Sequence, residues 1–150
     1  MDTAITAENY SLTMKRSFNA PKQAVYDAWI KSDALKSWFA PSSEMETLVH
    51  TLEPHVGGKY KIEMIEPDGK THLIHGEYVE LNPHDQLVFT WEWESDTQNV
   101  NSLVTIDLVD NNGVTELELT HEKLASKELV EVHTFGWTGC IAQLEVFMRS

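Results

Sequence analysis

The chain has 150 residues, of which 41% are hydrophobic and 23% are charged, a composition typical of one globular domain rather than of a disordered segment. Asp and Glu outnumber Lys and Arg by 24 to 11, and the resulting net charge of -13 repels phosphate backbones and anionic lipids. We therefore expect no nucleic-acid partner and no stable membrane association. The sequence has no basic segment followed by an apolar one, as a signal peptide would have, and no apolar run of about 18 residues that could span a membrane. We therefore expect a cytoplasmic protein.

The N-terminal part of the chain predicts a lead-in, a strand and two short helices. Residues 1–10 are polar and aperiodic, so we expect them to be a loose lead-in to a single domain over residues 11–150. Residues 11–18 alternate between apolar and polar side chains, which indicates a half-buried strand. Two helices are expected next, because apolar side chains recur three and four residues apart. Pro21 suits the first position of the first helix, and Ser32 is placed to cap the second.

The middle of the chain predicts a run of about six strands. Side chains alternate with a period of two over residues 59–64, 87–94, 104–108 and 116–121. Residues 45–52 form a weaker predicted strand, and residues 71–81 form another. Segments rich in Asn, Asp, Gly and Pro separate most of these strands, which favours hairpins and hence an antiparallel sheet.

Residues 128–148 predict one long amphipathic helix. Its apolar side chains recur at spacings of three and four, at Val130, His133, Trp137, Ile141, Leu144 and Met148. Gly136 and Gly139 each lower helix propensity by about 1 kcal/mol relative to alanine, so we expect the helix to approach another backbone closely there. This helix is the only predicted element long enough, at roughly 30 Å, to cover the apolar face of the sheet. The predicted fold class is therefore α+β, an antiparallel sheet curled around one helix.

Seven short segments occur in an informative order and spacing. They are Phe18–Pro21 leading into Val25–Trp29, Leu35–Pro41, Gly57–Tyr60, His75–Tyr78, Gln86–Trp91, Leu119–Glu122 and His133–Trp137. Together they resemble the SRPBCC superfamily, which includes START, birch-pollen-allergen and polyketide-cyclase relatives. They are most similar to stand-alone domains that resemble the C-terminal domain of the activator of the heat shock protein 90 ATPase.

The resemblance covers residues 12–148 and implies a helix-grip fold. In that fold a curved antiparallel sheet of about six or seven strands grips a long C-terminal helix, and two short helices after the first strand close one end. Such domains commonly leave a hydrophobic cavity between the sheet and the helix. The element order expected from the residues is compatible with this architecture.

Most residues expected to face this cavity are aromatic. The candidate ligand-binding residues are Trp38, Tyr60, His75, Trp91, Trp93, His133, Trp137, Ile141 and Leu144. Ligand pockets are mostly apolar with a few placed polar groups, so the leading hypothesis is binding of a small hydrophobic or amphipathic ligand, lipids included. The alternative is that the aromatic residues are packed core, and that each histidine is satisfied by a neighbouring carbonyl or hydroxyl.

Two other functions stay open. The resemblance implies a co-chaperone-like interaction with a chaperone partner, although the full activator carries an additional chaperone-binding domain for which this chain has no room. The other is a polyketide-cyclase-like enzyme, in which His75, His133 or Glu77 would move a proton. The sequence shows no paired acid and base, no nucleophile signature, no phosphate loop and no dinucleotide fingerprint. We therefore predict no catalytic residue and no cofactor.

The sequence also predicts no metal site. His72 and His75 lie three residues apart on a predicted strand and therefore face opposite sides of the sheet. The single cysteine, Cys140, excludes an intramolecular disulfide and a zinc site built from several thiolates. Because its neighbours are apolar or neutral, we expect this thiol to be buried.

Overall fold

The computed structural model describes residues 10–94 and 102–149. Its elements are β1 (Tyr10–Phe18), α1 (Lys22–Ile30), α2 (Ser32–Trp38), β2 (Glu46–Leu52), β3 (Lys59–Ile65), β4 (Thr71–Asn82), β5 (Gln86–Trp93), β6 (Ser102–Asn111), β7 (Val114–Leu124) and α3 (Lys127–Met148). The predicted α+β class, with two short helices after the first strand and a long helix at the end, is confirmed. Of the predicted lead-in, only Tyr10 is described, and it is the first residue of β1.

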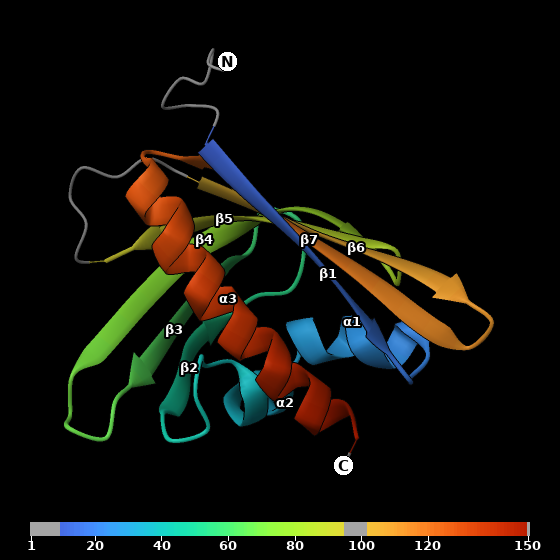
Figure 1. Cartoon of the computed structure of the whole chain (residues 1–150), viewed down its shortest axis with the longest axis horizontal. Helices are drawn as coiled ribbons and strands as arrows, with labels where there is room; N and C mark the ends of the chain where they lie inside the picture. Colours follow the sequence, from blue (N-terminus) through green and yellow to red (C-terminus); the bar gives the residue numbers. More distant parts are fainter. Residues whose placement is uncertain (1–9, 95–101, 150) are drawn as a thin grey trace.

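The seven strands form one antiparallel sheet in the order β1-β7-β6-β5-β4-β3-β2. Consecutive strands pair as hairpins from β2 to β7, as the turn sequences predict. The first strand then pairs with the last, from Tyr10 opposite Leu124 to Phe18 opposite Thr115. Figure 1 shows α3 crossing the curved sheet, with α1 and α2 lying near the C-terminal end of α3. The helix-grip arrangement is confirmed. Among the described residues, no helix combines the length and apolarity needed to cross a bilayer.

The two short helices begin one residue away from the predicted positions. Pro21 is the N-cap of α1 rather than its first residue. The prediction that Ser32 caps α2 is wrong, because Lys31 is the N-cap and no side chain caps this helix. Only Lys31 separates α1 from α2. This one residue, with extended backbone, is therefore both the C-cap of α1 and the N-cap of α2.

One of the two glycines in α3 is explained by close packing. A Cβ atom on Gly139 would lie 2.1 Å from the carbonyl oxygen of Pro41, so only glycine lets the helix approach this backbone. The expectation for Gly136 is wrong, since no described atom lies within 4 Å of the position of its Cβ apart from its chain neighbours and the backbone of α3 itself. The contact between Gly139 and Pro41 fixes α3 against the segment that leads from α2 to β2.

Candidate functional site

Aromatic side chains from distant elements meet between the sheet and the helices. The indole ring of Trp137 on α3 lies 4.9 Å from that of Trp91 on β5 and 6.0 Å from that of Trp29 on α1. The ring of Phe39, just after α2, lies 6.0 Å from Trp137 and 6.1 Å from Trp91. We call this set the aromatic cluster. Residues from α1, β5, α3 and the end of α2 therefore converge on one buried space.

His121 is held by hydrogen bonds on both ring nitrogens. The indole Nε1–H of Trp137 donates to Nδ1 of His121 at 3.0 Å. The proton of the imidazole is therefore on Nε2, which donates to the hydroxyl of Ser102 at 2.9 Å. That hydroxyl donates in turn to the carbonyl of Trp91 at 2.8 Å. This chain fixes the tautomer of His121 and leaves it no lone pair for a ligand.

His133 on α3 is fixed in a similar way. The indole Nε1–H of Trp93 donates to Nε2 of His133 at 2.9 Å, and Nδ1–H of His133 donates to the carbonyl of Leu129 at 2.7 Å. The rings of His133 and His121 lie 4.8 Å apart. Both histidines are satisfied by their neighbours, which for His133 is the alternative that the sequence left open.

Burial keeps these histidines neutral. It lowers the pKa of His121 to about 2, and the adjacent His133 adds to this shift. It also lowers the pKa of His133, although the hydrogen bond to Leu129 acts in the opposite direction. Burial raises the pKa of the Cys140 thiol to about 12, so that it stays protonated at neutral pH. The buried position predicted for Cys140 is confirmed.

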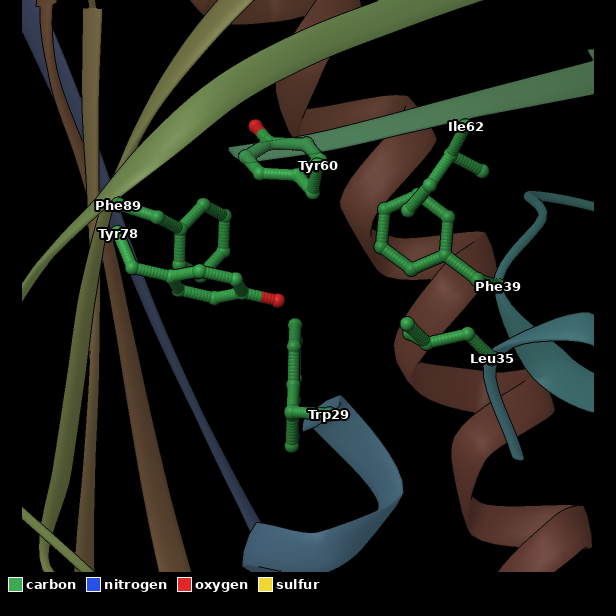
Figure 2. A pocket seen from close by; sticks show the side chains of 7 residues that line it. All are labelled: Trp29, Leu35, Phe39, Tyr60, Ile62, Tyr78 and Phe89. Atoms are coloured by element: carbon green, nitrogen blue, oxygen red, sulfur yellow. The ribbon is translucent and has the colours of Figure 1, made fainter. Parts of the chain in front are cut away.

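A small cavity remains at the side of the aromatic cluster nearest to α1 and α2. Its volume is about 20 Å³. Its walls are formed by Trp29, Leu35, Phe39, Tyr60, Ile62, Tyr78 and Phe89 (Figure 2). Such a volume holds about one water molecule, whereas pockets for drug-sized ligands occupy roughly 300 Å³ or more. The interior is therefore largely filled by side chains.

Two indole N–H groups of this interior have no hydrogen-bond partner among the described residues. They belong to Trp29, which lines the cavity, and to Trp91. Both side chains are buried, with 3% and 5% of their surfaces exposed. The indole of Trp38, by contrast, donates to the carbonyl of Ala28 at 2.9 Å. A buried donor without a partner costs about 1–3 kcal/mol, so each of the two orphaned donors calls for an explanation.

Most of the predicted ligand-binding residues lie inside the molecule. Those that are buried or half-buried on the inner side are Trp38, Tyr60, Trp91, Trp93, His133, Trp137, Ile141 and Leu144. Only Tyr60 of this set lines the cavity. The others pack around the cluster or elsewhere in the core, so their role as ligand contacts stays a prediction.

His75 lies on the outer face of the sheet, and the prediction that it faces the interior is wrong. It is half-exposed, and its Nε2 lies 3.6 Å from a carboxylate oxygen of Glu92 and 3.7 Å from one of Glu94. Glu77, two residues further along β4, is also on the outer face and lies 3.5 Å from the ammonium of Lys59. Because Ile74, Gly76 and Tyr78 take the inner face, the intervening odd-numbered residues point outward.

The candidate proton-transfer residues do not converge. His133 is inside the molecule, whereas His75 and Glu77 are on the other side of the sheet. Across residues 10–94 and 102–149, no group of three or more His, Cys, Asp or Glu side chains is placed to hold a metal ion. His72 packs against Trp93 on the inner side, opposite to His75, as predicted.

Sequence reasoning missed six of the seven residues that line the cavity. They are Trp29, Leu35, Phe39, Ile62, Tyr78 and Phe89. A signal existed for most of them, because they occupy the apolar stripe of α1 or α2, or the apolar alternation of β3 and β5. That signal marks every inward residue equally and does not identify those bordering an unfilled space.

A larger groove lies on the outer face of the sheet. It has a volume of about 540 Å³ and is lined by His50, Thr51, Lys61, Glu63, Thr71, Leu73 and Glu94. It is open to solvent, and His50 in its wall lies 2.8 Å from a carboxylate oxygen of Glu63. A ligand there would keep its contact with water, so the buried cavity is the better candidate site.

Known sequences relate the chain to one family. The family model described as "Activator of Hsp90 ATPase homolog 1-like protein" matches residues 19–149. The human protein "Activator of 90 kDa heat shock protein ATPase homolog 1" is 26% identical over 107 residues. That alignment covers 71% of this chain but only 27% of the human protein, so the chain matches about a quarter of this relative's length.

Solved structures share the fold over nearly the whole chain. The protein CV1439 from Chromobacterium violaceum is 25% identical with a TM-score of 0.86, covering 93% of this chain and 97% of its own. The AHSA1 protein from Silicibacter pomeroyi is 22% identical with a TM-score of 0.79, covering 91% and 96% of the two chains. The protein NE0264 from Nitrosomonas europaea is 23% identical with a TM-score of 0.79, covering 98% of each chain.

Proposed function

Because the chain belongs to the family of Activator of Hsp90 ATPase homolog 1-like proteins and has the helix-grip fold of SRPBCC proteins, we propose that it binds a small apolar or amphipathic molecule between the sheet and the helices. The observation that carries this proposal is Trp29, which lines a cavity and whose buried indole N–H has no partner among the described residues. A bound acceptor would satisfy this donor, and the apolar walls would supply affinity of roughly 25 cal/mol per Å² buried, before the costs of association.

The ligand requires the cavity to widen. The sheet side of the cavity is held by the hydrogen-bond ladders between β3, β4 and β5. The other side is formed by Trp29 on α1, Leu35 on α2 and Phe39 just after α2. Figure 2 shows these three side chains reaching toward the strands from the helical side. Since α1 and α2 are short, they are the elements expected to move when a ligand enters.

A compound screen by NMR tests this function. Neutral aromatic metabolites, fatty acids and lipids are titrated into the ¹⁵N-labelled protein, and native mass spectrometry of freshly purified protein checks for a co-purified molecule. We expect at least one compound to shift the indole resonance of Trp29 and the amides of Leu35 and Tyr78, while that of His75 stays in place. The proposal fails if no compound shifts these interior resonances and no added mass is found.

A pair of variants locates the binding. Ile62→Phe adds bulk to the wall of the cavity and should abolish the shifts. Ile106→Phe makes the same change in a fully buried residue of β6 outside the cavity lining and should leave ligand binding intact. Equal loss in both variants would show that binding depends on overall stability rather than on this cavity.

A protein-interaction function is the second candidate. Phe135 on α3 is 80% exposed, and Val132 and Val146 on the same helix are 61% and 54% exposed. Successive spacings of three and eleven residues place all three on one side of the helix. Exposed apolar residues gathered in this way are typical of interaction sites, and the name of the human relative suggests a chaperone as partner.

A retention experiment tests that candidate. The immobilised protein should retain the 90 kDa heat shock protein of its own cell, and Phe135→Ala should reduce this retention. Val56→Ala is the matched control, since Val56 is 62% exposed but lies between β2 and β3 rather than on α3. Failure of the unaltered protein to retain the chaperone would dismiss this function. The polyketide-cyclase-like alternative has no geometric support, because its three candidate residues face two different spaces.

A further inference from the structure

Three of the side chains that line the cavity carry a polar group, namely Trp29, Tyr60 and Tyr78. The indole N–H of Trp29 is unused among the described residues. The hydroxyl of Tyr78 points toward Trp29 and the middle of the space, whereas that of Tyr60 points away and donates to the carbonyl of Thr90 (Figure 2). The other lining side chains carry no polar atom. An indole N–H can only donate, so the cavity's unmet requirement is for an acceptor.

The acceptors of the neighbouring interior are already engaged. Nδ1 of His121 accepts from Trp137, and Nε2 of His133 accepts from Trp93. Neither imidazole therefore has a free lone pair for a donor group on a ligand. The hydroxyl of Tyr78 could accept a hydrogen bond from a ligand, but a ligand that presents only donors would still leave the indole N–H of Trp29 without an acceptor.

The surroundings of the cavity also exclude charge. None of the seven residues that line it is acidic, basic or a histidine. Burial raises the pKa of Tyr60 and of Tyr78, so neither phenol ionises at neutral pH. An ion moved into such walls would lose its hydration without finding a counter-charge.

On the premise of the proposed function, we infer that the ligand is a small uncharged molecule with at least one hydrogen-bond acceptor, such as a ketone or an ester. The indole Nε1–H of Trp29 binds that acceptor, and Leu35, Phe39 and Phe89 contact the apolar remainder. Trp29 is thereby a specificity-determining residue: it separates acceptor-bearing molecules from hydrocarbons of the same shape.

Two probes of nearly the same shape test this inference. Acetophenone carries a carbonyl oxygen at the position where α-methylstyrene carries a terminal =CH₂ group. Only acetophenone can therefore accept a conventional hydrogen bond from an N–H group. In the unaltered protein, acetophenone should move the Trp29 indole proton downfield, and α-methylstyrene should not. In Trp29→Phe, the preference for acetophenone, measured as the ratio of the two Kd values, should fall roughly three- to tenfold, as expected for one hydrogen bond.

A second tryptophan provides the matched control. The ring of Trp38 lies 4.8 Å from that of Trp29, but its N–H already donates to Ala28. Trp38→Phe removes the same atoms and should leave the ratio unchanged. If Trp29→Phe does not fold, the Trp29 indole resonance of the unaltered protein still shows whether acetophenone, and not α-methylstyrene, accepts a hydrogen bond from this residue.

The outcomes separate the two proposals. If both probes bind but neither the ratio nor the Trp29 resonance distinguishes them, the inference is overturned while the proposed function stands. If neither probe shifts any interior resonance up to its solubility limit, the result contradicts the inference and counts against the proposed function as well. The expected pattern of ratio and resonance would support both.

Discussion

His133 illustrates how one hydrogen bond can set the protonation of a buried side chain. Its Nε2 accepts from the indole of Trp93, so a proton added there would face another N–H group. The same histidine lies 4.8 Å from His121, which is also neutral. Protonation of either ring would break a buried hydrogen bond and place a charge inside the aromatic cluster.

We expect this arrangement to make stability depend on pH. In the unfolded chain a histidine titrates near 6.5, and in the folded protein both pKa values are lower. The unfolded state therefore binds more protons below pH 6.5, and stability is fully present above this pH and falls as the pH decreases. Each of the two histidines should contribute up to about 1.4 kcal/mol per pH unit. Urea unfolding between pH 7 and pH 5 measures this slope.

The variant His133→Gln isolates one of the two contributions. Glutamine carries both an acceptor for Trp93 and a donor for Leu129, but does not titrate. The slope between pH 6.5 and pH 5 should become shallower by up to about 1.4 kcal/mol per unit. A slope equal to that of the unaltered protein would mean that His133 is not held neutral.

Residue orientation on β4 shows where sequence reasoning reaches its limit. Gly76 has no side chain, so the alternation of Ile74, Gly76 and Tyr78 does not reveal which face is buried. The ring of Tyr60 occupies the missing volume, since a Cβ on Gly76 would lie 2.7 Å from it. Tyr60 belongs to a neighbouring strand. The outward position of His75 therefore depends on a tertiary contact that local periodicity does not contain.

Within α3, the two glycines should respond oppositely to substitution. Gly139→Ala would place a methyl group 2.1 Å from the Pro41 carbonyl oxygen, and the required shift should cost about 1–3 kcal/mol. The methyl group of Gly136→Ala would meet no described atom within 4 Å beyond its chain neighbours and the backbone of α3, so this change should stabilise the helix by up to about 1 kcal/mol. Chemical denaturation of both variants measures the difference. Similar effects at the two positions would contradict the close approach at Gly139.

The strands and helices were more predictable from the sequence than the residues that line the cavity. Strong alternation in β5 and regular spacing in α3 predict both elements, because side-chain periodicity follows directly from backbone geometry. Helix α2 starts one residue earlier than predicted, because Lys31 alone links the two helices and caps an end of each. Of the seven cavity-lining residues only Tyr60 was identified, because unfilled space depends on how differently shaped side chains pack together in three dimensions.

For the whole molecule, the net charge of -13 should make stability increase with salt. Repulsion among the excess carboxylates is present in the compact state and is screened as the ionic strength rises. Between about 10 mM and 150 mM NaCl at pH 7.5, Tm should rise by roughly 2–4 °C, equivalent to about 1 kcal/mol for a domain of this size. Calorimetry with NaCl and KCl checks the effect, which should be the same for both salts. A falling Tm would mean that attractive ion pairs outweigh the repulsion.

The pairing of β1 with β7 has a consequence for how the molecule is made. Tyr10 lies opposite Leu124, and Phe18 opposite Thr115. A ribosome adds about 5–20 residues per second. On the order of ten seconds therefore pass between the synthesis of β1 and that of its partner β7. During this time the backbone groups of β1 are unpaired, and closing such a large loop slows folding. Nascent chains stalled before residue 114 should therefore be sensitive to proteases and recruit ribosome-associated holdases, whereas the released chain should not.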